Sequence, residues 1–225
     1  MLTDLRNNFD FFIRNKTRFS RKNFVEKNQK LIERNKKENL YTIDVLEKFF
    51  KKASKSELAI LDIGCKNWFY AKGEYEFFKN FCSKFTLDGV EIDAYRLYNN
   101  FYSRYEVAKY YIKDLKNTNY IAGNLLDLDK KYDYIIWFLP FVVKEPHIYW
   151  GLPKKYFYPK KLLKHAYKLL NSDGQMLITN QGKTEAEEQE KLLQELKIPY
   201  KALGEIKSAH FEYQNKRFGF LIHKN

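Results

Sequence analysis

The sequence predicts an α/β fold, in which a doubly wound, mostly parallel sheet carries helices on both faces. Three observations lead to this fold class. Strand-like apolar runs alternate with segments of helical spacing, a pattern typical of parallel strands joined by helices. Several of these runs end in acidic or polar residues, as strands do beside the ligand site of an open α/β sheet. Neither an internal repeat nor a proline- or glycine-rich linker divides the 225 residues.

The first predicted strand carries the most information. Residues 58–68 read LAILDIGCKNW, an apolar run that breaks into a polar loop after Asp62 and Gly64. Such a run is typical of a buried parallel strand that ends in a tight turn before a helix. Glycine in this turn can adopt positive φ and lets the backbone approach a ligand closely. An acid and a glycine at this position therefore predict a site for a nucleotide-like cofactor.

The second predicted strand, residues 87–93, ends in two acids, Glu91 and Asp93. Both lie on one face, because side chains alternate along a strand. An acid at the end of the second strand, about 20 residues or somewhat more after the first turn, is where a ribose diol is held. We therefore expect Glu91 to bind a ribose. Asp93 could instead cap a helix that begins near Ala94.

The remaining elements continue the alternation of strands and helices. Strands are expected at 119–127, 132–140 and 174–180, and a hairpin at 211–220 around Asn215. Helices are expected at 73–85, 94–113, 160–170 and 183–196. Near the N-terminus, partial helical spacing predicts a helix that begins at Thr42 or Asp44 and runs to residue 52.

Taken in order, these motifs resemble those of the class I S-adenosylmethionine-dependent methyltransferases, over roughly residues 57–182. The first motif of that family, an acid, an apolar residue and a glycine-rich loop, is similar to Asp62-Ile63-Gly64. Its later motifs are similar to Gly89-Val90-Glu91, Gly123-Asn124-Leu125, Tyr132-Asp133 and the turn at 170–174. The resemblance implies seven strands, the last one antiparallel, and S-adenosylmethionine as the cofactor.

The resemblance also assigns roles to residues. It implies that Asp62, Gly64 and their turn shape the methionine side of the cofactor, that Glu91 holds the ribose, and that Asn124 with Leu125 frames the adenine. Asn124 stands where the family often has Asp, and its amide oxygen can accept the same hydrogen bond from the adenine amino group. The residues expected to bind the cofactor are Asp62, Gly64, Cys65, Lys66, Glu91, Ile92, Asn124, Leu125 and Phe138.

Two further residues, both in the loop after the first predicted strand, depart from the family pattern. Lys66 and Trp68 stand where the family usually has further glycines. Lys66 could pair with the cofactor carboxylate or could narrow the site, and Asn67 could shape the turn because Asn tolerates left-handed backbone. These departures leave open a non-catalytic S-adenosylmethionine-binding module on the same fold. A nicotinamide-dependent enzyme is disfavoured by the single glycine of the loop and by the closing hairpin.

The loop after the fourth strand, residues 138–153, bears on the methyl acceptor. Its segment Leu139-Pro140-Phe141 resembles, incompletely, the Asn/Asp-Pro-Pro-aromatic motif of amino-group methyltransferases, but the Asn or Asp is absent. A general base is needed only if the acceptor must lose its proton early. The polar candidates for that role are Glu145, His147 and Tyr149, each of which is also a residue type that packs in loops.

Charge is distributed unevenly along the chain. The net charge is +13, and residues 1–56 alone carry +8, from 15 Lys/Arg and 7 Asp/Glu. We interpret residues 1–56 as a basic helical extension packed on the core, and residues 57–225 as the methyltransferase-like domain. Phenylalanines interleave with the basic side chains, a pattern that can bind a phosphate backbone and stack bases. The candidate RNA contacts are Arg14, Lys16, Arg18, Arg21 and Lys22, with a merely solvated basic face as the alternative.

Composition argues against several other classes of protein. No apolar run reaches about 18 residues, so no membrane-spanning helix is expected. The N-terminus lacks the apolar core of a signal peptide, and two cysteines provide no disulfide framework, so a cytoplasmic location is expected. The four histidines have no metal-binding spacing. The sequence therefore predicts a cytoplasmic S-adenosylmethionine-dependent methyltransferase, with RNA preferred over a small molecule as the acceptor.

Overall fold

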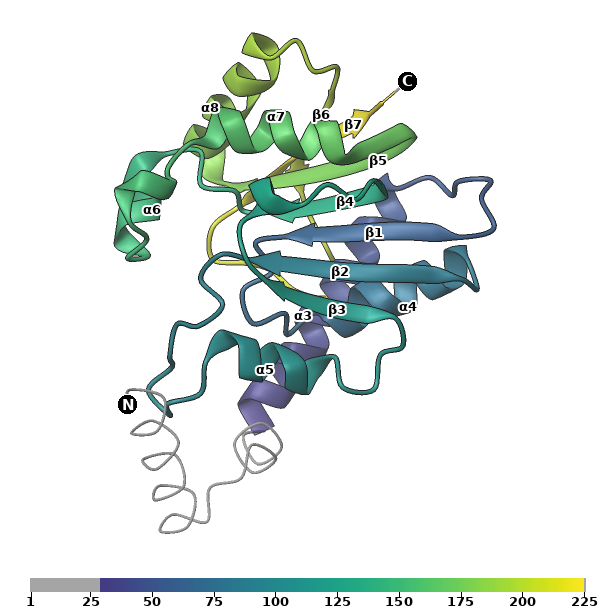
Figure 1. Ribbon diagram of the computed structural model, residues 1–225, viewed down its shortest axis with the longest axis vertical. Helices are drawn as coiled ribbons and strands as arrows, with labels where there is room; N and C mark the ends of the chain where they lie inside the picture. Colours follow the sequence, from purple (N-terminus) through teal and green to yellow (C-terminus); the bar gives the residue numbers. More distant parts are fainter. Residues whose placement is uncertain (1–28, 225) are drawn as a thin grey trace.

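The computed structural model of the protein describes residues 29–224, which form a seven-stranded sheet flanked by helices (Figure 1). The strand order is β3-β2-β1-β4-β5-β7-β6. The strands span Leu58–Ile63 (β1), Phe85–Glu91 (β2), Thr118–Ala122 (β3), Tyr132–Phe138 (β4), Leu170–Gln181 (β5), Lys201–Ile206 (β6) and Arg217–His223 (β7). Strands β1 to β5 pair in parallel, whereas β7 is antiparallel to both β5 and β6.

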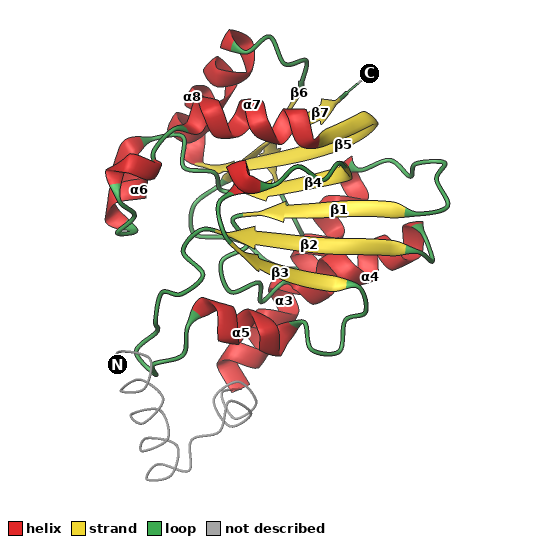
Figure 2. Ribbon diagram, viewed as in Figure 1, coloured by secondary structure: helices red, strands yellow, loops and turns green. Residues whose placement is uncertain are grey.

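Helices cover both faces of this sheet (Figure 2). They span Gln29–Phe49 (α3), Ala71–Phe81 (α4), Arg104–Tyr111 (α5), Lys144–Tyr149 (α6), Pro159–Leu169 (α7) and Gly182–Glu195 (α8), with short 3₁₀ turns at Leu125–Asp127 (η1) and Lys154–Tyr156 (η2). One apolar cluster joins α3, α4 and α5 to one face, and a second joins α7 and α8 to the other. Strands β1 and β4 are buried along nearly their whole length because both of their faces are covered.

Helix α3 belongs to the core of the molecule, although it precedes the first strand. Val45 and Leu46 are fully buried and join the same cluster as Phe77 and Phe78 of α4. This packing agrees with an N-terminal extension that lies on the core. The domain boundary at residue 56 itself stays a prediction.

The predicted fold class is confirmed, including the parallel sheet and the antiparallel C-terminal strand. The predicted helix at 94–113 is wrong over its first ten residues, because α5 begins only at Arg104. Ser103 caps it: the Ser103 hydroxyl accepts a hydrogen bond from the Glu106 amide, and the Glu106 carboxylate accepts one from the Ser103 amide. Asp93 is therefore not a helix cap. It forms ion pairs with Arg96 and Arg104 instead.

Two other predicted boundaries are corrected. The N-terminal helix does not begin at Thr42 or Asp44, because α3 runs continuously through both, and the Thr42 hydroxyl donates to the Glu38 carbonyl within the helix. The hairpin is not centred on Asn215. Its strands are β6 and β7, so residues 207–216 form the connection and not a strand. Sequence alternation at 211–216 reflects aromatic side chains that pack from a loop, such as Phe211 and Tyr213.

Candidate functional site

A cavity of about 510 Å³ opens at the carboxyl ends of β1, β2, β3 and β4. The chain leaves β1 toward one side of the sheet and β4 toward the other, so the crevice lies at the topological switch point where α/β folds bind ligands. Its floor includes Gly64, Glu91 and Gly123, which follow or end β1, β2 and β3 respectively. The cavity continues past the end of β4 to side chains from α3, β5 and β7.

The loop after β1 has the backbone of a glycine-rich turn, although it contains one glycine. Gly64, Lys66 and Trp68 have φ angles of 72°, 55° and 46°. Positive φ is unusual in a bulky residue and costs about 1–2 kcal/mol per non-glycine position. Lys66 and Trp68 thus adopt a backbone conformation that glycine takes readily, so three residues of this loop have glycine-like backbone angles although only one is a glycine.

The side chain of Trp68 lies in the protein core and not in the cavity. It is fully buried, and its indole Nε1 donates a hydrogen bond of 2.9 Å to Glu74 Oε2. The ring packs on Gly89 of β2, where an added Cβ would lie 2.9 Å from ring carbons of Trp68. Trp68 therefore does not obstruct the site. It fills the space beneath the loop and supports it.

Glu91 connects the ends of β1 and β2. Its carboxylate accepts hydrogen bonds from the backbone amides of Lys66 at 2.8 Å and Asp93 at 2.7 Å. Arg104 Nη1 lies 3.8 Å from Glu91 Oε1, close enough for an ion pair. Although Glu91 is largely buried, it lines the cavity. The carboxylate is thus held in a fixed orientation, with lone pairs left for the hydroxyl groups of a ligand.

Asp62 lies beneath the loop, in a buried cluster with Glu74 and Tyr70. Tyr70 donates its hydroxyl to Asp62 Oδ2 at 2.9 Å. Burial raises the pKa of both Asp62 and Glu74. The charge of Asp62 raises the pKa of Glu74 further, whereas the hydrogen bonds of Asp62 with Tyr70 and Glu74 oppose the rise in the pKa of Asp62. Asp62 Oδ1 and Glu74 Oε1 are buried without a partner among the described residues. Protonation of one of the two carboxyl groups would provide a donor for the other.

Lys66 turns its side chain over the cavity toward α6. Its Nζ lies 4.5 Å from the centre of the Trp150 ring, and Arg104 Cζ lies 5.5 Å from the same ring. Burial, followed by the positive charges of Arg104 and Arg34, lowers the pKa of Lys66. Trp150, which follows α6, therefore contacts two cationic side chains, Lys66 and Arg104, on the side of the cavity that the loop after β1 forms.

The adenine side of the predicted site is formed by Asn124, Leu125 and Ile92, all of which line the cavity. The Asn124 side chain already has two partners: Oδ1 accepts from the Leu126 amide at 3.1 Å, and Nδ2 donates to the Tyr158 hydroxyl at 2.8 Å. The amide oxygen keeps one further lone pair for an amino group.

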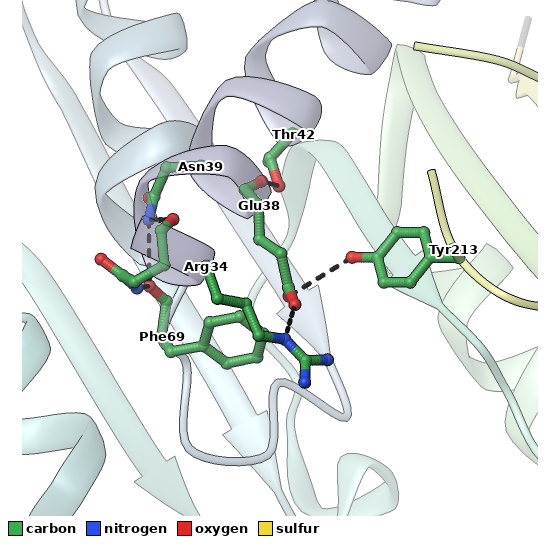
Figure 3. Close-up of polar contacts among 7 residues, drawn as sticks. Arg34, Glu38, Asn39, Thr42, Phe69 and Tyr213 are labelled. Carbon is green, nitrogen blue, oxygen red and sulfur yellow. Dashed lines mark hydrogen bonds and ion pairs between the residues drawn. The ribbon is translucent and has the colours of Figure 1, made fainter. Parts of the chain in front are cut away.

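The far half of the cavity is formed by α3 and by the segment that leads into β7 (Figure 3). Arg34 Nε donates to Glu38 Oε1 at 2.6 Å, and the Tyr213 hydroxyl lies 3.4 Å from Glu38 Oε2. The Arg217 guanidinium stacks on Tyr213, with 4.4 Å from Cζ to the ring centre. Residues at positions 34, 38, 41 and 42 share one face of α3, and this face borders the cavity.

Most of the cofactor-binding residues predicted from the sequence gather at one place. Gly64, Lys66, Glu91, Ile92, Asn124, Leu125 and Phe138 line the cavity. Asp62 and Cys65 are fully buried and lie behind it. Burial and the neighbouring acids also raise the pKa of the Cys65 thiol, so it is not a reactive group. Which of these residues contact a cofactor stays a prediction.

The three candidate bases are not brought together. Glu145 and Tyr149 do not line the cavity, and the Tyr149 side chain is 88% exposed. His147 does line it, but its Nε2 is bonded to the Pro153 carbonyl at 3.0 Å, and its ring packs edge-on against Phe141. The candidate RNA contacts Arg14, Lys16, Arg18, Arg21 and Lys22 lie outside the described residues.

Sequence reasoning missed the residues of the far half of the cavity. These are Arg34, Glu38, Tyr41, Tyr213 and Arg217. The spacing of the first three along α3 was available as a signal, whereas nothing local marks Arg217. Within residues 29–224, no group of His, Cys, Asp and Glu could hold a metal ion, and no helix has the length and apolar character to cross a membrane.

Comparisons with known proteins give the fold. No protein-family model matches the sequence, and no curated protein is significantly similar to it. Among solved structures, an S-adenosylmethionine-dependent methyltransferase from Aquifex aeolicus is 14% identical, with a TM-score of 0.57 over 82% of this chain and 90% of that one. Precorrin-6y C5,15-methyltransferase from Geobacter metallireducens is 12% identical, with a TM-score of 0.53 over 83% and 87%.

A third structure, magnesium protoporphyrin IX methyltransferase from Synechocystis with bound S-adenosylmethionine, is 12% identical, with a TM-score of 0.51 over 99% of this chain and 96% of that one. At these identities the likeness concerns the fold. The protein has the Rossmann-like fold of class I S-adenosylmethionine-dependent methyltransferases, as the resemblance of its motifs implied.

Proposed function

We propose that the protein is an S-adenosylmethionine-dependent methyltransferase that acts on a small molecule. The observation that carries this proposal is the cavity at the ends of β1 to β4, with the glycine-like loop at 64–68 on one side and the oriented Glu91 carboxylate on the other. The fold shared with structures of such enzymes supports it. The presence of Lys66 and Trp68 in place of glycines does not oppose it, since both residues have the positive φ that glycine takes readily.

The residues present fit this cofactor. A Cβ added at Gly64 or Gly123 would meet nothing within 4 Å, so both backbones border open space in which a ligand can lie. Glu91 has the charge and lone pairs to accept two ribose hydroxyl groups. Lys66, which borders the same space, can pair with the amino-acid carboxylate of the cofactor. Ile92 and Leu125 provide apolar surface for the adenine ring.

When bound, the cofactor supplies an electrophilic methyl group on a sulfonium, which an acceptor lone pair attacks in line, leaving a neutral thioether while the acceptor loses its proton. The task of the chain is to hold the acceptor in that line and to exclude water. Phe138, Leu139 and Tyr70 line the cavity between its two halves, where the reacting atoms would meet. Leu139 has a positive φ of 60°, an outlier of the kind that clusters at functional sites.

A small molecule is the acceptor that the described residues favour. A cavity of about 510 Å³ has the dimensions of a small-ligand site, and it is walled by α3 and α6. The structurally similar enzymes named above act on precorrin-6y and on magnesium protoporphyrin IX. The RNA hypothesis rested on basic residues that lie outside the described range, and no described contact supports it.

Calorimetric titration with S-adenosylmethionine, S-adenosylhomocysteine and NAD tests the cofactor. Saturable binding of the first two is expected, with NAD binding at least about tenfold weaker because the loop at 64–68 offers a single glycine to a pyrophosphate. Tighter binding of NAD would overturn the proposal. A steeply salt-dependent RNA affinity in the same protein would restore RNA as an acceptor.

A further inference from the structure

The far half of the cavity contains a cation without a counter-ion. Arg217 lies at the start of β7 and lines the cavity, and within the described part of the chain its one side-chain hydrogen bond runs from Nη1 to Gln181 Oε1 at 3.1 Å. That bond uses one of the five N–H groups of a guanidinium. Stacking on Tyr213 holds the group in place. Its remaining donors have no partner within the described part of the chain.

The neighbouring carboxylates of the described residues are engaged elsewhere and do not contact Arg217 directly. The Glu38 carboxylate is engaged by Arg34 and by the Tyr213 hydroxyl, so Arg34 and Glu38 form a neutral pair. Glu185 also lines the cavity, and it accepts a hydrogen bond from the Gln181 amide at 2.9 Å. Burial raises the pKa of Glu185 and lowers the pKa of Arg217, while the attraction between the two opposite charges acts against both shifts. Among the described residues, neither Glu38 nor Glu185 forms a hydrogen bond or an ion pair with Arg217.

The walls near Arg217 are aromatic. The Tyr41 and Tyr213 rings meet edge to face, with centroids 5.0 Å apart, and Tyr70 lies against Phe138 with centroids 5.8 Å apart. All four residues line the cavity. Flat apolar walls of this kind favour a planar ring over a flexible polar ligand. Strand β7, which carries Arg217, lies three strands from β1, about 14 Å across the sheet. A ligand bound to Arg217 therefore extends toward the side of the cavity that the loop after β1 forms.

We propose that the methyl acceptor is a small aromatic carboxylic acid whose carboxylate pairs with Arg217 while its ring lies against the aromatic side chains that line the cavity. The guanidinium fork matches a carboxylate in geometry, and one guanidinium matches the charge of a monoanion better than that of a phosphate dianion. Recognition of this kind places the reacting atom at the opposite end of the ring from the carboxylate. This inference rests on the proposed methyltransferase function.

Benzoate, benzamide and benzylamine serve as probes that share a ring and differ in charge. Each is titrated against the protein saturated with S-adenosylhomocysteine, and also against the protein alone, with binding followed by saturation-transfer NMR. Benzoate is expected to bind at least about tenfold more tightly than either neutral or cationic probe, the difference that one charge-assisted contact provides. Equal binding of benzamide, tighter binding of benzylamine, or no binding of benzoate overturns the inference.

Two substitutions locate the contact. Arg217→Gln is expected to weaken benzoate at least about tenfold and to leave the affinity for S-adenosylhomocysteine within about twofold. Lys216→Gln removes the same charge one residue earlier, from an exposed side chain paired with Glu205 outside the cavity, and should leave both affinities unchanged. Arg217→Lys keeps the positive charge and is the second variant, for use if Arg217→Gln is unstable. It should retain part of the benzoate binding.

The two proposals fail separately in this design. If the unmodified protein binds benzoate but not S-adenosylhomocysteine, the proposed cofactor is wrong and the proposed carboxylate contact stands. Unchanged benzoate affinity in a folded Arg217→Gln variant overturns the carboxylate contact alone. Near-UV circular dichroism of each variant establishes that it is folded before its affinities are compared.

Discussion

The indole ring of Trp68 occupies the space that a side chain at Gly89 would need, since a Cβ there would lie 2.9 Å from three atoms of Trp68 and Cys65. The two residues therefore depend on each other: the loop after β1 can carry a large residue because β2 has no side chain at position 89. The large side chain of Trp68 is thus accommodated by a glycine of the neighbouring strand. The loop after β1 is supported by packing from below, with its cavity side left open.

Gly89→Ala should lower the free energy of unfolding by about 1–3 kcal/mol, the cost of overpacking a filled core. Gly123→Ala is the matched control, because its Cβ would meet nothing within 4 Å, and it should change stability by less than about 0.5 kcal/mol. Urea denaturation measures both. Equal losses in the two variants would show that Trp68 does not fill the space at Gly89.

Glu91→Gln should weaken S-adenosylhomocysteine by about tenfold or more, because it replaces charge-assisted bonds to the ribose by neutral ones. The amide keeps the shape of the side chain and one acceptor for the Lys66 backbone. Asp93→Asn is the control, since Asp93 pairs mainly with Arg96 and Arg104, and it should have a smaller effect. Calorimetry decides between them, and equal losses would move the ribose contact away from Glu91.

The carboxyl pair of Asp62 and Glu74 predicts a loss of stability at alkaline pH. The pKa of each is raised in the folded protein by burial, from ordinary values of 3.8 and 4.5. The folded state therefore binds protons more tightly than the unfolded state, and stability is fully present below about pH 4 and falls as pH rises through the folded pKa values. Glu74→Gln removes one titrating group and keeps a donor for Asp62.

The difference in melting temperature between Glu74→Gln and the unmodified protein should therefore grow in favour of the variant from pH 5 to pH 9. The effects of groups that titrate in both proteins cancel in this difference. Asp133 is one such group: hydrogen bonds from Lys55 and from the Ala59 amide help to lower its pKa. Melting curves that stay parallel across this range would show that the two carboxyl groups do not share a proton.

Trp150→Ala should weaken S-adenosylhomocysteine several-fold, chiefly through faster dissociation, because Trp150 connects α6 to Lys66 and Arg104. A cation–π contact at a partly exposed site contributes about 0.5–2 kcal/mol. Tyr149→Ala, at a side chain that is 88% exposed and outside the cavity, is the control and should leave the dissociation rate unchanged. Stopped-flow displacement measures both rates. Identical rates in the two variants would exclude Trp150 as a cover of the site.

The cofactor half of the site could be predicted because its signals are local. Gly64 and Glu91 each follow a strand-like run, and parallel strands bring their carboxyl ends to one edge. The far half could not, because Arg34 and Arg217 are brought together by a strand that returns into the sheet between β5 and β6. The predicted helix from residue 94 failed for a related reason. Its apolar spacing was real, but the Ser103 cap determined where the helix begins.

The position of β7 between β5 and β6 has a consequence for the order in which the protein assembles. Strand β6 pairs with β7 and with no other strand of the described sheet, so it has no place to dock until residues 217–223 have been synthesised. Until then β5 presents an open edge, which is a template for wrong pairing. Because Arg217 is the first residue of that inserted strand, the far end of the cavity is completed only at this late step of biosynthesis.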